Sequence, residues 1–135
     1  MIKSLFIKIF LFLCISSTSL AEIINVNNKQ IKDLLVESIP VVDIRTSTEW
    51  EQTGIIPNSV LLTFFEKNGA YDFEKWNTKL DSIIDTNKPF ILICRSGRRT
   101  KIISEMINKN YDKVIYNAEF GINSWLQSNL KTIKP

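Results

Sequence analysis

The chain has 135 residues, of which 44% are hydrophobic and 23% are charged, with a formal net charge of +3. This composition supports one globular domain and excludes a low-complexity or disordered chain. Histidine is absent, which excludes Ser-His-Asp triads, Cys-His dyads and His-ligated zinc, and two cysteines cannot form a four-cysteine metal site. We therefore expect no metal and no cofactor. The small, scattered net charge also disfavours a dedicated nucleic-acid binder.

Residues 1–21 have the pattern of a secretory signal peptide. Lys3 and Lys8 make the start positive, residues 9–15 are wholly apolar, and small residues end the segment at Ala21. The apolar run is shorter than the about 20 residues that a membrane-spanning helix needs. The sequence thus predicts cleavage between Ala21 and Glu22, export to a bacterial periplasm and no stable membrane insertion afterwards. An uncleaved N-terminal anchor is the alternative.

Cleavage would change both the charge and the cysteine count. Removing Lys3 and Lys8 from the 17 basic residues leaves 15, against 14 acidic ones, so steering toward anionic polymers is not expected. Cys14 would also be lost, and Leu13 before it disfavours lipoprotein processing because it is not small. Cys94 would then be a lone thiol in an oxidising compartment, which favours a functional thiol over a merely buried one.

Strands and helices alternate along residues 22–135, which we expect to form a single domain and a monomer. The first strand is expected at 23–26, followed by a helix over 30–38 that Asn27 or Asn28 caps. A buried strand at 40–45 precedes a short helix that Ser47 or Thr48 caps. Later strands are expected at 59–62, 89–93 and 113–116, with loops at 63–71 and 117–121. Later helices are expected from 72 or 73 to 85 (with Phe73, Trp76, Leu80, Ile83 and Ile84 inward), after Thr100, and over 122–130. This alternation predicts an α/β fold with a central, mainly parallel five-stranded sheet and helices on both faces.

Polar side chains follow two of the expected strands. Asp43 and Arg45 end the strand at 40–45, and the loop at 94–99 follows the most apolar strand. That loop holds a thiol, three guanidinium groups, a hydroxyl and Gly97, which allows the backbone to reverse. Its amides and the start of the next helix would surround the Cys94 sulfur with positive potential and favour the thiolate. Such a nest would also bind a small anion.

Four segments in this order resemble the rhodanese (sulfurtransferase) domain family. The loop CRSGRRT at 94–100 resembles the family's active-site loop, and 42–50 resembles its Asp-x-Arg…Glu-Trp signature. The segments 54–59 and 120–125 resemble its Gly-His-Ile-Pro-Gly-Ala turn and its closing Gly-Gly-x-x-x-Trp. The resemblance spans roughly 23–130 and is closest to small exported single-domain members. It implies a three-layer rhodanese-like fold.

Three positions depart from the family's pattern. Ile55 replaces a common His, Asn58 replaces a Gly, and Phe120 replaces a Gly. Asn tolerates positive φ better than other non-glycine residues, so we expect Asn58 to keep the turn. Phe120 lies in a loop expected near the site, where it would narrow the substrate entrance.

The resemblance implies that Cys94 is the nucleophile. Its thiolate would take sulfur from an anionic donor such as thiosulfate and become a persulfide, which cyanide or a thiol then discharges. Loop amides from 95 to 99 would stabilise the thiolate and the terminal sulfur. Arg95 and Arg98 would receive the donor, and Arg99 would close the loop by bonding loop carbonyls or a carboxylate. Ser96 would either donate to the sulfur or shape the loop.

The family's pattern also implies a structural bracket. In it, Asp43 caps neighbouring backbone amides and Arg45 pairs with Glu49, with direct substrate contact as the alternative.

Other functions remain to be weighed. A phosphatase or arsenate reductase of the Cys-x₅-Arg type needs Arg where this chain has Thr100. A non-catalytic rhodanese-like binding module usually lacks the cysteine that this chain keeps. A persulfide carrier that serves a specific exported partner stays open beside a free-standing sulfurtransferase.

Overall fold

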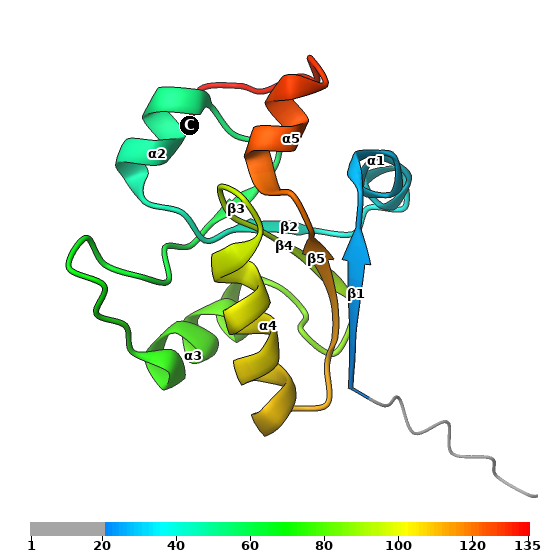
Figure 1. Ribbon diagram of the computed structural model, residues 1–135. Helices are drawn as coiled ribbons and strands as arrows, with labels where there is room; N and C mark the ends of the chain where they lie inside the picture. Colours follow the sequence, from blue (N-terminus) through cyan, green and yellow to red (C-terminus); the bar gives the residue numbers. More distant parts are fainter. Residues whose placement is uncertain (1–20) are drawn as a thin grey trace, which may run out of the picture.

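The computed structural model describes residues 21–135, which form an α/β domain around a five-stranded sheet (Figure 1). The strand order is β1-β5-β4-β2-β3, and every neighbouring pair is parallel. In chain order the elements are β1 (Glu22–Val26), α1 (Asn28–Val36), β2 (Val41–Asp43), α2 (Ser47–Thr53), β3 (Val60–Leu61), α3 (Phe73–Ile83), β4 (Phe90–Ile93), α4 (Arg98–Asn110), β5 (Val114–Ala118) and α5 (Gly121–Gln127). Residues 1–20 of the predicted signal segment lie outside this description. Within 21–135 no helix has the length and apolarity needed to cross a membrane.

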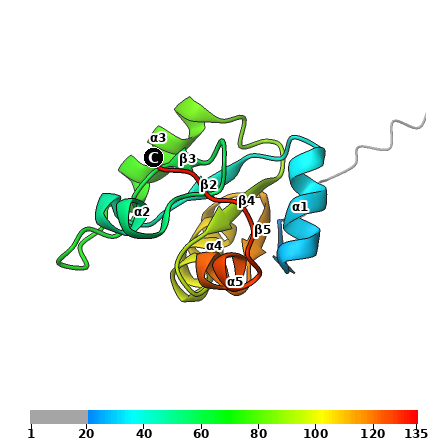
Figure 2. The same ribbon diagram turned by 90° about the horizontal axis from the view of Figure 1, so that it is seen from above.

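Helices cover both faces of the sheet, which confirms the predicted layers. Phe90 and Leu92 of the central strand β4 belong to the core under α3 and α4, whereas Ile91 and Ile93 belong to the core under α1 and α5 (Figures 1 and 2). All four side chains of β4 are at most 1% exposed. A parallel strand buried on both faces needs an apolar residue at every position, which accounts for the run Phe-Ile-Leu-Ile.

Side-chain caps start the first three helices. Asn27 accepts a hydrogen bond from the Gln30 amide and so begins α1, as the sequence predicts. Thr46, and not the predicted Ser47 or Thr48, begins α2, because its extended backbone lets its hydroxyl accept from the Glu49 amide. Asp72 caps α3 through the Lys75 amide.

One predicted boundary and one predicted buried residue are wrong. The loop expected at 117–121 is shorter, because edge strand β1 pairs with β5 as far as Val26 and Ala118, and α5 begins at Gly121. There the Asn117 amide donates to the Asn25 oxygen at 2.9 Å. Ile83, expected inward, is 45% exposed. The chain leaves the helix at Ile84, whose extended backbone packs that side chain against the core instead.

The segment after α5 crosses back toward α2 (Figure 2). Ile133 and Ile55 exchange two backbone hydrogen bonds of 2.9 Å, which form an isolated antiparallel bridge. The Trp125 indole donates to the carbonyl of Lys131 at 2.9 Å. The end of the chain therefore packs against the turn that follows α2.

Candidate active site

Cys94 lies directly after β4, where the chain turns into α4. Its side chain is 1% exposed and joins the core under α3 and α4. The Gly97 amide donates to Sγ at 3.1 Å, and the Thr100 hydroxyl lies 3.5 Å from Sγ. Both groups come from the start of the 13-residue helix α4, whose positive dipole end favours negative charge at this sulfur. The loop thus presents one backbone amide and one hydroxyl to the sulfur.

The start of α5 fixes the direction of the loop. The carbonyl of Cys94 accepts from the Ile122 amide at 2.9 Å, and the carbonyl of Arg95 accepts from the Asn123 amide at 3.1 Å. With both carbonyls turned toward α5, the loop presents an amide rather than a carbonyl to the sulfur. Gly97 has a φ of 92° and lies so close to Glu119 that a Cβ would overlap the Glu119 carbonyl oxygen. Only glycine combines this backbone conformation with this close approach.

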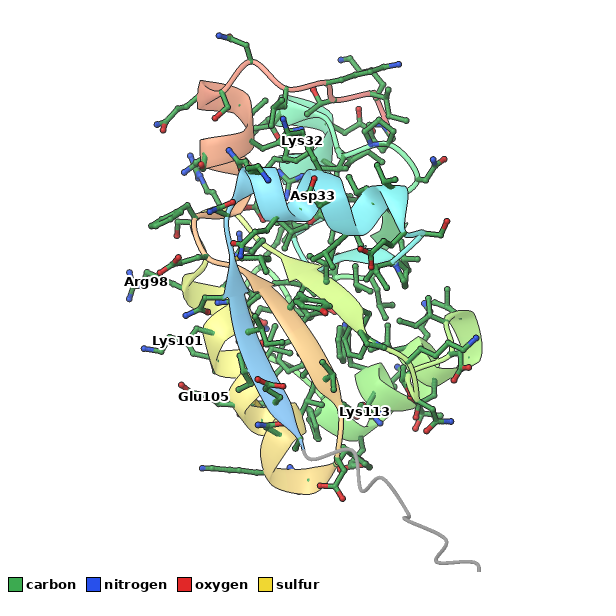
Figure 3. The ribbon with its side chains drawn as sticks, turned by 90° about the vertical axis from the view of Figure 1, so that its right-hand side faces the viewer. Lys32, Asp33, Arg98, Lys101, Glu105 and Lys113 are labelled. Atoms are coloured by element: carbon green, nitrogen blue, oxygen red, sulfur yellow. The ribbon has the colours of Figure 1, made fainter. Side chains whose placement is uncertain are left out.

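The loop residues divide by exposure. Arg95, Ser96 and Arg98 are exposed, and Figure 3 shows Arg98 projecting outward from the start of α4. Gly97 is buried and Arg99 is half-buried. Ser96 makes no hydrogen bond to Sγ within residues 21–135, so its hydroxyl does not donate to the sulfur. The guanidinium groups of Arg95 and Arg98 are therefore at the surface, whereas that of Arg99 is only partly accessible.

The predicted pairing of Arg45 with Glu49 is wrong. Arg45 instead binds the Asp43 carboxylate through Nη2 at 2.7 Å and Nε at 2.9 Å, and both side chains are fully buried. The Asp43 carboxylate also accepts from the Arg45 backbone amide at 3.1 Å, as expected of a cap. Asp43 is the last residue of β2 and Arg45 follows two positions later in the chain, a spacing that brings their side chains together.

Glu49 binds Arg99 across the site. The two contacts are 2.6 and 2.9 Å long, a bidentate arrangement that ties α2 to the first turn of α4. Glu49 also accepts from the Thr46 amide, which completes the capping box of α2. Arg99 therefore closes the loop through a carboxylate, one of its two predicted modes.

This pairing shifts both titrations. Burial alone would raise the pKa of Glu49, but hydrogen bonds from Arg99 and Thr46 and the positive charge of Arg99 lower that pKa from 4.5 to about 2. The hydrogen bond to Glu49 raises the pKa of Arg99 above its ordinary value, against the opposing effect of burial. Both groups are therefore charged at neutral pH.

Arg45 extends the bracket to the end of α2. Its guanidinium donates to the Thr53 hydroxyl at 2.7 Å and to the Gly54 carbonyl at 2.9 Å, in addition to Asp43. This buried charge is thereby paired and hydrogen-bonded, which is what makes its burial tolerable. Asp43 and Arg45 thus hold α2 in place, and α2 presents Glu49 to Arg99.

Thr100 is the site residue that sequence reasoning missed. Its role there was limited to excluding a Cys-x₅-Arg loop, yet its buried hydroxyl is a neighbour of Sγ and donates to the Gly97 carbonyl at 3.2 Å. The sequence feature that could have indicated this role is the position of Thr100 in the first turn of the helix that follows the loop. Phe120, 56% exposed, directly precedes Gly121 and so borders the loop. No cluster of three or more potential metal ligands occurs within the described residues.

Comparison with known proteins gives a consistent picture. Residues 26–128 match the rhodanese-like domain family. An uncharacterised protein of Rickettsia rickettsii is 30% identical, with 78% of this chain and 94% of that protein covered. The rhodanese-like domain protein of Staphylococcus aureus is 25% identical, covers 76% of this chain and 90% of its own, and superposes with a TM-score of 0.58. The polysulfide-sulfur transferase of Wolinella succinogenes is 22% identical. The match covers 82% of this chain and 78% of that protein, with a TM-score of 0.62.

The depressed pKa of Glu49 predicts a pH-dependent contribution to stability. A carboxylate with a lowered pKa in the folded state stabilises the protein above its unfolded pKa of 4.5, and this stabilisation is lost as the pH falls toward about 2. We expect Glu49→Gln to lower the free energy of unfolding by about 1–2 kcal/mol near neutral pH, discounted for partial exposure. Denaturant titrations of both proteins should converge at acidic pH. Glu51→Gln, exposed on the same helix, is the control and should have little effect. If the free energies of unfolding of wild type and Glu49→Gln differed by the same amount at every pH, the ion-pair assignment would be contradicted.

Gly121 predicts a second, geometric dependence. Its φ is 60°, and a Cβ there would lie 2.5 Å from the carbonyl carbon and oxygen of Arg95. Gly69 has a φ of 82° with nothing within 4 Å of its Cβ position, so Gly69→Ala tests the backbone conformation alone and should cost about 1–2 kcal/mol. Gly121→Ala should cost clearly more, about 3 kcal/mol or above, because the loop must also move. Equal losses in thermal or denaturant unfolding would show that α5 does not fix the loop.

Proposed function

The chain belongs to the rhodanese-like domain family, and we propose that it moves sulfane sulfur through a persulfide on Cys94. The observation that carries this proposal is the position of Sγ at the start of α4, within reach of the Gly97 amide and the Thr100 hydroxyl. The Gly97 amide and the positive end of α4 stabilise negative charge at this sulfur, and the charged form of cysteine is its nucleophilic form. The name of the Wolinella relative, a polysulfide-sulfur transferase, supports sulfur as the transferred group.

The first step is displacement at sulfur. The Cys94 thiolate attacks the outer sulfur of thiosulfate, a bond forms between Sγ and that sulfur, and sulfite leaves with the electron pair of the broken sulfur–sulfur bond. The loop amides would stabilise the negative charge that the outer sulfur keeps as the end of the persulfide anion. Arg95 and Arg98, both exposed at the loop, attract the doubly charged donor. Attack by a thiolate transfers no proton, so this step needs no general base.

The second step returns the enzyme to its starting state. A thiolate or cyanide attacks the terminal sulfur of the persulfide, and the bond to Sγ breaks with its electrons returning to Cys94. Cys94 is the only cysteine among the described residues, so the acceptor comes from outside this part of the chain. The persulfide places its terminal sulfur about 2 Å from Sγ. Because Cys94 itself is 1% exposed, only a donor of small cross-section would reach Sγ. The acceptor would instead react with the terminal sulfur of the persulfide, which lies nearer the surface.

Two further aspects rest on the sequence. The pattern of residues 1–21 supports export, and a cut after Ala21 would leave β1 intact because that strand begins at Glu22. The partner would be a small anionic sulfur donor together with a thiol or cyanide. The carrier alternative uses the same persulfide and differs only in requiring a specific protein as acceptor.

Replacing Cys94 tests the persulfide directly. Cys94→Ser should abolish transfer of sulfur from thiosulfate to cyanide, because a serine hydroxyl stays protonated near neutrality. The side chains have similar size, so unfolding curves should change little. Intact mass spectrometry after incubation with thiosulfate should show wild-type protein heavier by one sulfur atom and no adduct on the variant. Substantial thiocyanate formation by the variant would contradict the mechanism. Hydrolysis of aryl phosphates by the wild type, in place of sulfur transfer, would favour the phosphatase alternative.

The exposed arginines predict a split between donor binding and stability. Arg95→Ala and Arg98→Ala should each raise the KM for thiosulfate roughly tenfold, the loss expected for one charge-assisted contact of about 1.4 kcal/mol. Stability should change by no more than about 1 kcal/mol. Lys109→Ala removes the same charge from the far end of α4, about 16 Å from Arg98 by helix rise and beyond the screening length. If this control raised KM as much, only net charge would matter and the loop arginines would have no specific role.

A further inference from the structure

A concave surface lies on the other face of the sheet from Cys94. It is a groove of about 640 Å³ between α1, the start of β2, the turn before β3 and the segment after α5. Val41, Ile56 and Trp125 line it and belong to the core under α1 and α5, whereas Cys94 belongs to the opposite core. Val41 is in register with Ile91, three residues before Cys94 and about 10 Å back along the strand. The groove is therefore separate from the sulfur site.

The walls of this groove are apolar. Leu35 of α1, Ile39 before β2 and Leu130 after α5 line it and are only partly buried. Each therefore keeps apolar surface exposed to solvent within one continuous hollow. Its volume falls in the range of about 300–1,000 Å³ that is usual for small-molecule sites. Covering such surface is favourable in proportion to the apolar area removed from water.

The charged residues of the groove have one sign. Lys32 and Lys131 line it, and no Asp or Glu does. Figure 3 shows Lys32 on the edge of α1 that faces the segment after α5. The neighbouring carboxylate of Asp33 binds Lys29 at 3.2 Å instead. Within residues 21–135 neither Lys32 nor Lys131 forms an ion pair, so both ammonium groups are available to a ligand.

We propose that this groove binds an amphipathic anion, a molecule with an unbranched alkyl chain and a carboxylate head. The chain would lie on Val41, Ile56 and Trp125, and the head would lie between Lys32 and Lys131. Charge selects the ligand class, because a cationic amphiphile would meet two like charges and a neutral one would leave both lysines unused.

The test is titration of decanoate into the full chain, followed by backbone and indole NMR signals. Signals of Val41, Ile56 and the Trp125 indole should shift with saturation, whereas Gly97 should not move. Lys32→Gln with Lys131→Gln should weaken decanoate binding roughly three- to tenfold, as expected for the loss of two partly exposed ion pairs. Lys29→Gln, which removes the same charge one turn earlier on α1 and outside the groove, should leave the affinity unchanged.

A neutral analogue and a concentration series complete the test. Decanol should bind more weakly than decanoate and should not respond to the lysine changes. Equal affinity for the two ligands, or no effect of the double variant, would overturn the proposal. Shifts of the groove signals with protein concentration alone would assign the groove to a second copy of the chain, which also overturns it. Cys94→Ser should bind decanoate as the wild type does, so this result is independent of sulfur transfer.

Discussion

Two backbone amides at the start of α5 decide which way the Cys94 loop faces. They hold the carbonyls of Cys94 and Arg95, and with those carbonyls occupied, the Gly97 amide turns toward the sulfur. A carbonyl in its place would oppose negative charge on Sγ, so the chemistry of the site depends on this packing. The cost of the arrangement is steric, because the backbone contact leaves no room for a Cβ at Gly97 or Gly121.

The two ion pairs around the loop differ in how deeply they are buried, and they differ correspondingly in what they hold in place. The Asp43–Arg45 pair is fully buried and holds α2 through the Gly54 carbonyl. The Glu49–Arg99 pair, with 19% and 27% of its side chains exposed, passes that constraint from α2 to α4. A buried pair adds little net stability, because desolvation opposes the attraction between the charges. Its contribution here is orientation, since bidentate contacts fix where each helix begins relative to the loop.

The strand and helix pattern could be predicted from sequence because it depends on local periodicity and on where apolar runs end. The loop at 94–99 could be predicted as the site because its composition is unusual at the end of a buried strand. The partner of Arg45 could not be, since Asp43 and Glu49 are both within reach along the chain. Only packing decides that Glu49 turns away to cap α2 and bind Arg99. The contact of Thr100 with Sγ could not be predicted for a similar reason. The local sequence around a buried helical threonine is the same whether its side chain faces the core or a sulfur.

The absence of histidine gives this site a fixed electrostatic environment. Glu49, with a pKa of about 2, and Arg99, with a raised pKa, keep their charges from mildly acidic to alkaline conditions. The other groups in contact with Sγ are a backbone amide and a hydroxyl at the start of α4, and neither titrates in that range. A histidine-assisted site would gain or lose its base near neutrality. The Glu49–Arg99 pair therefore keeps its charges across that range and would contribute no pH dependence of its own to the proposed reaction.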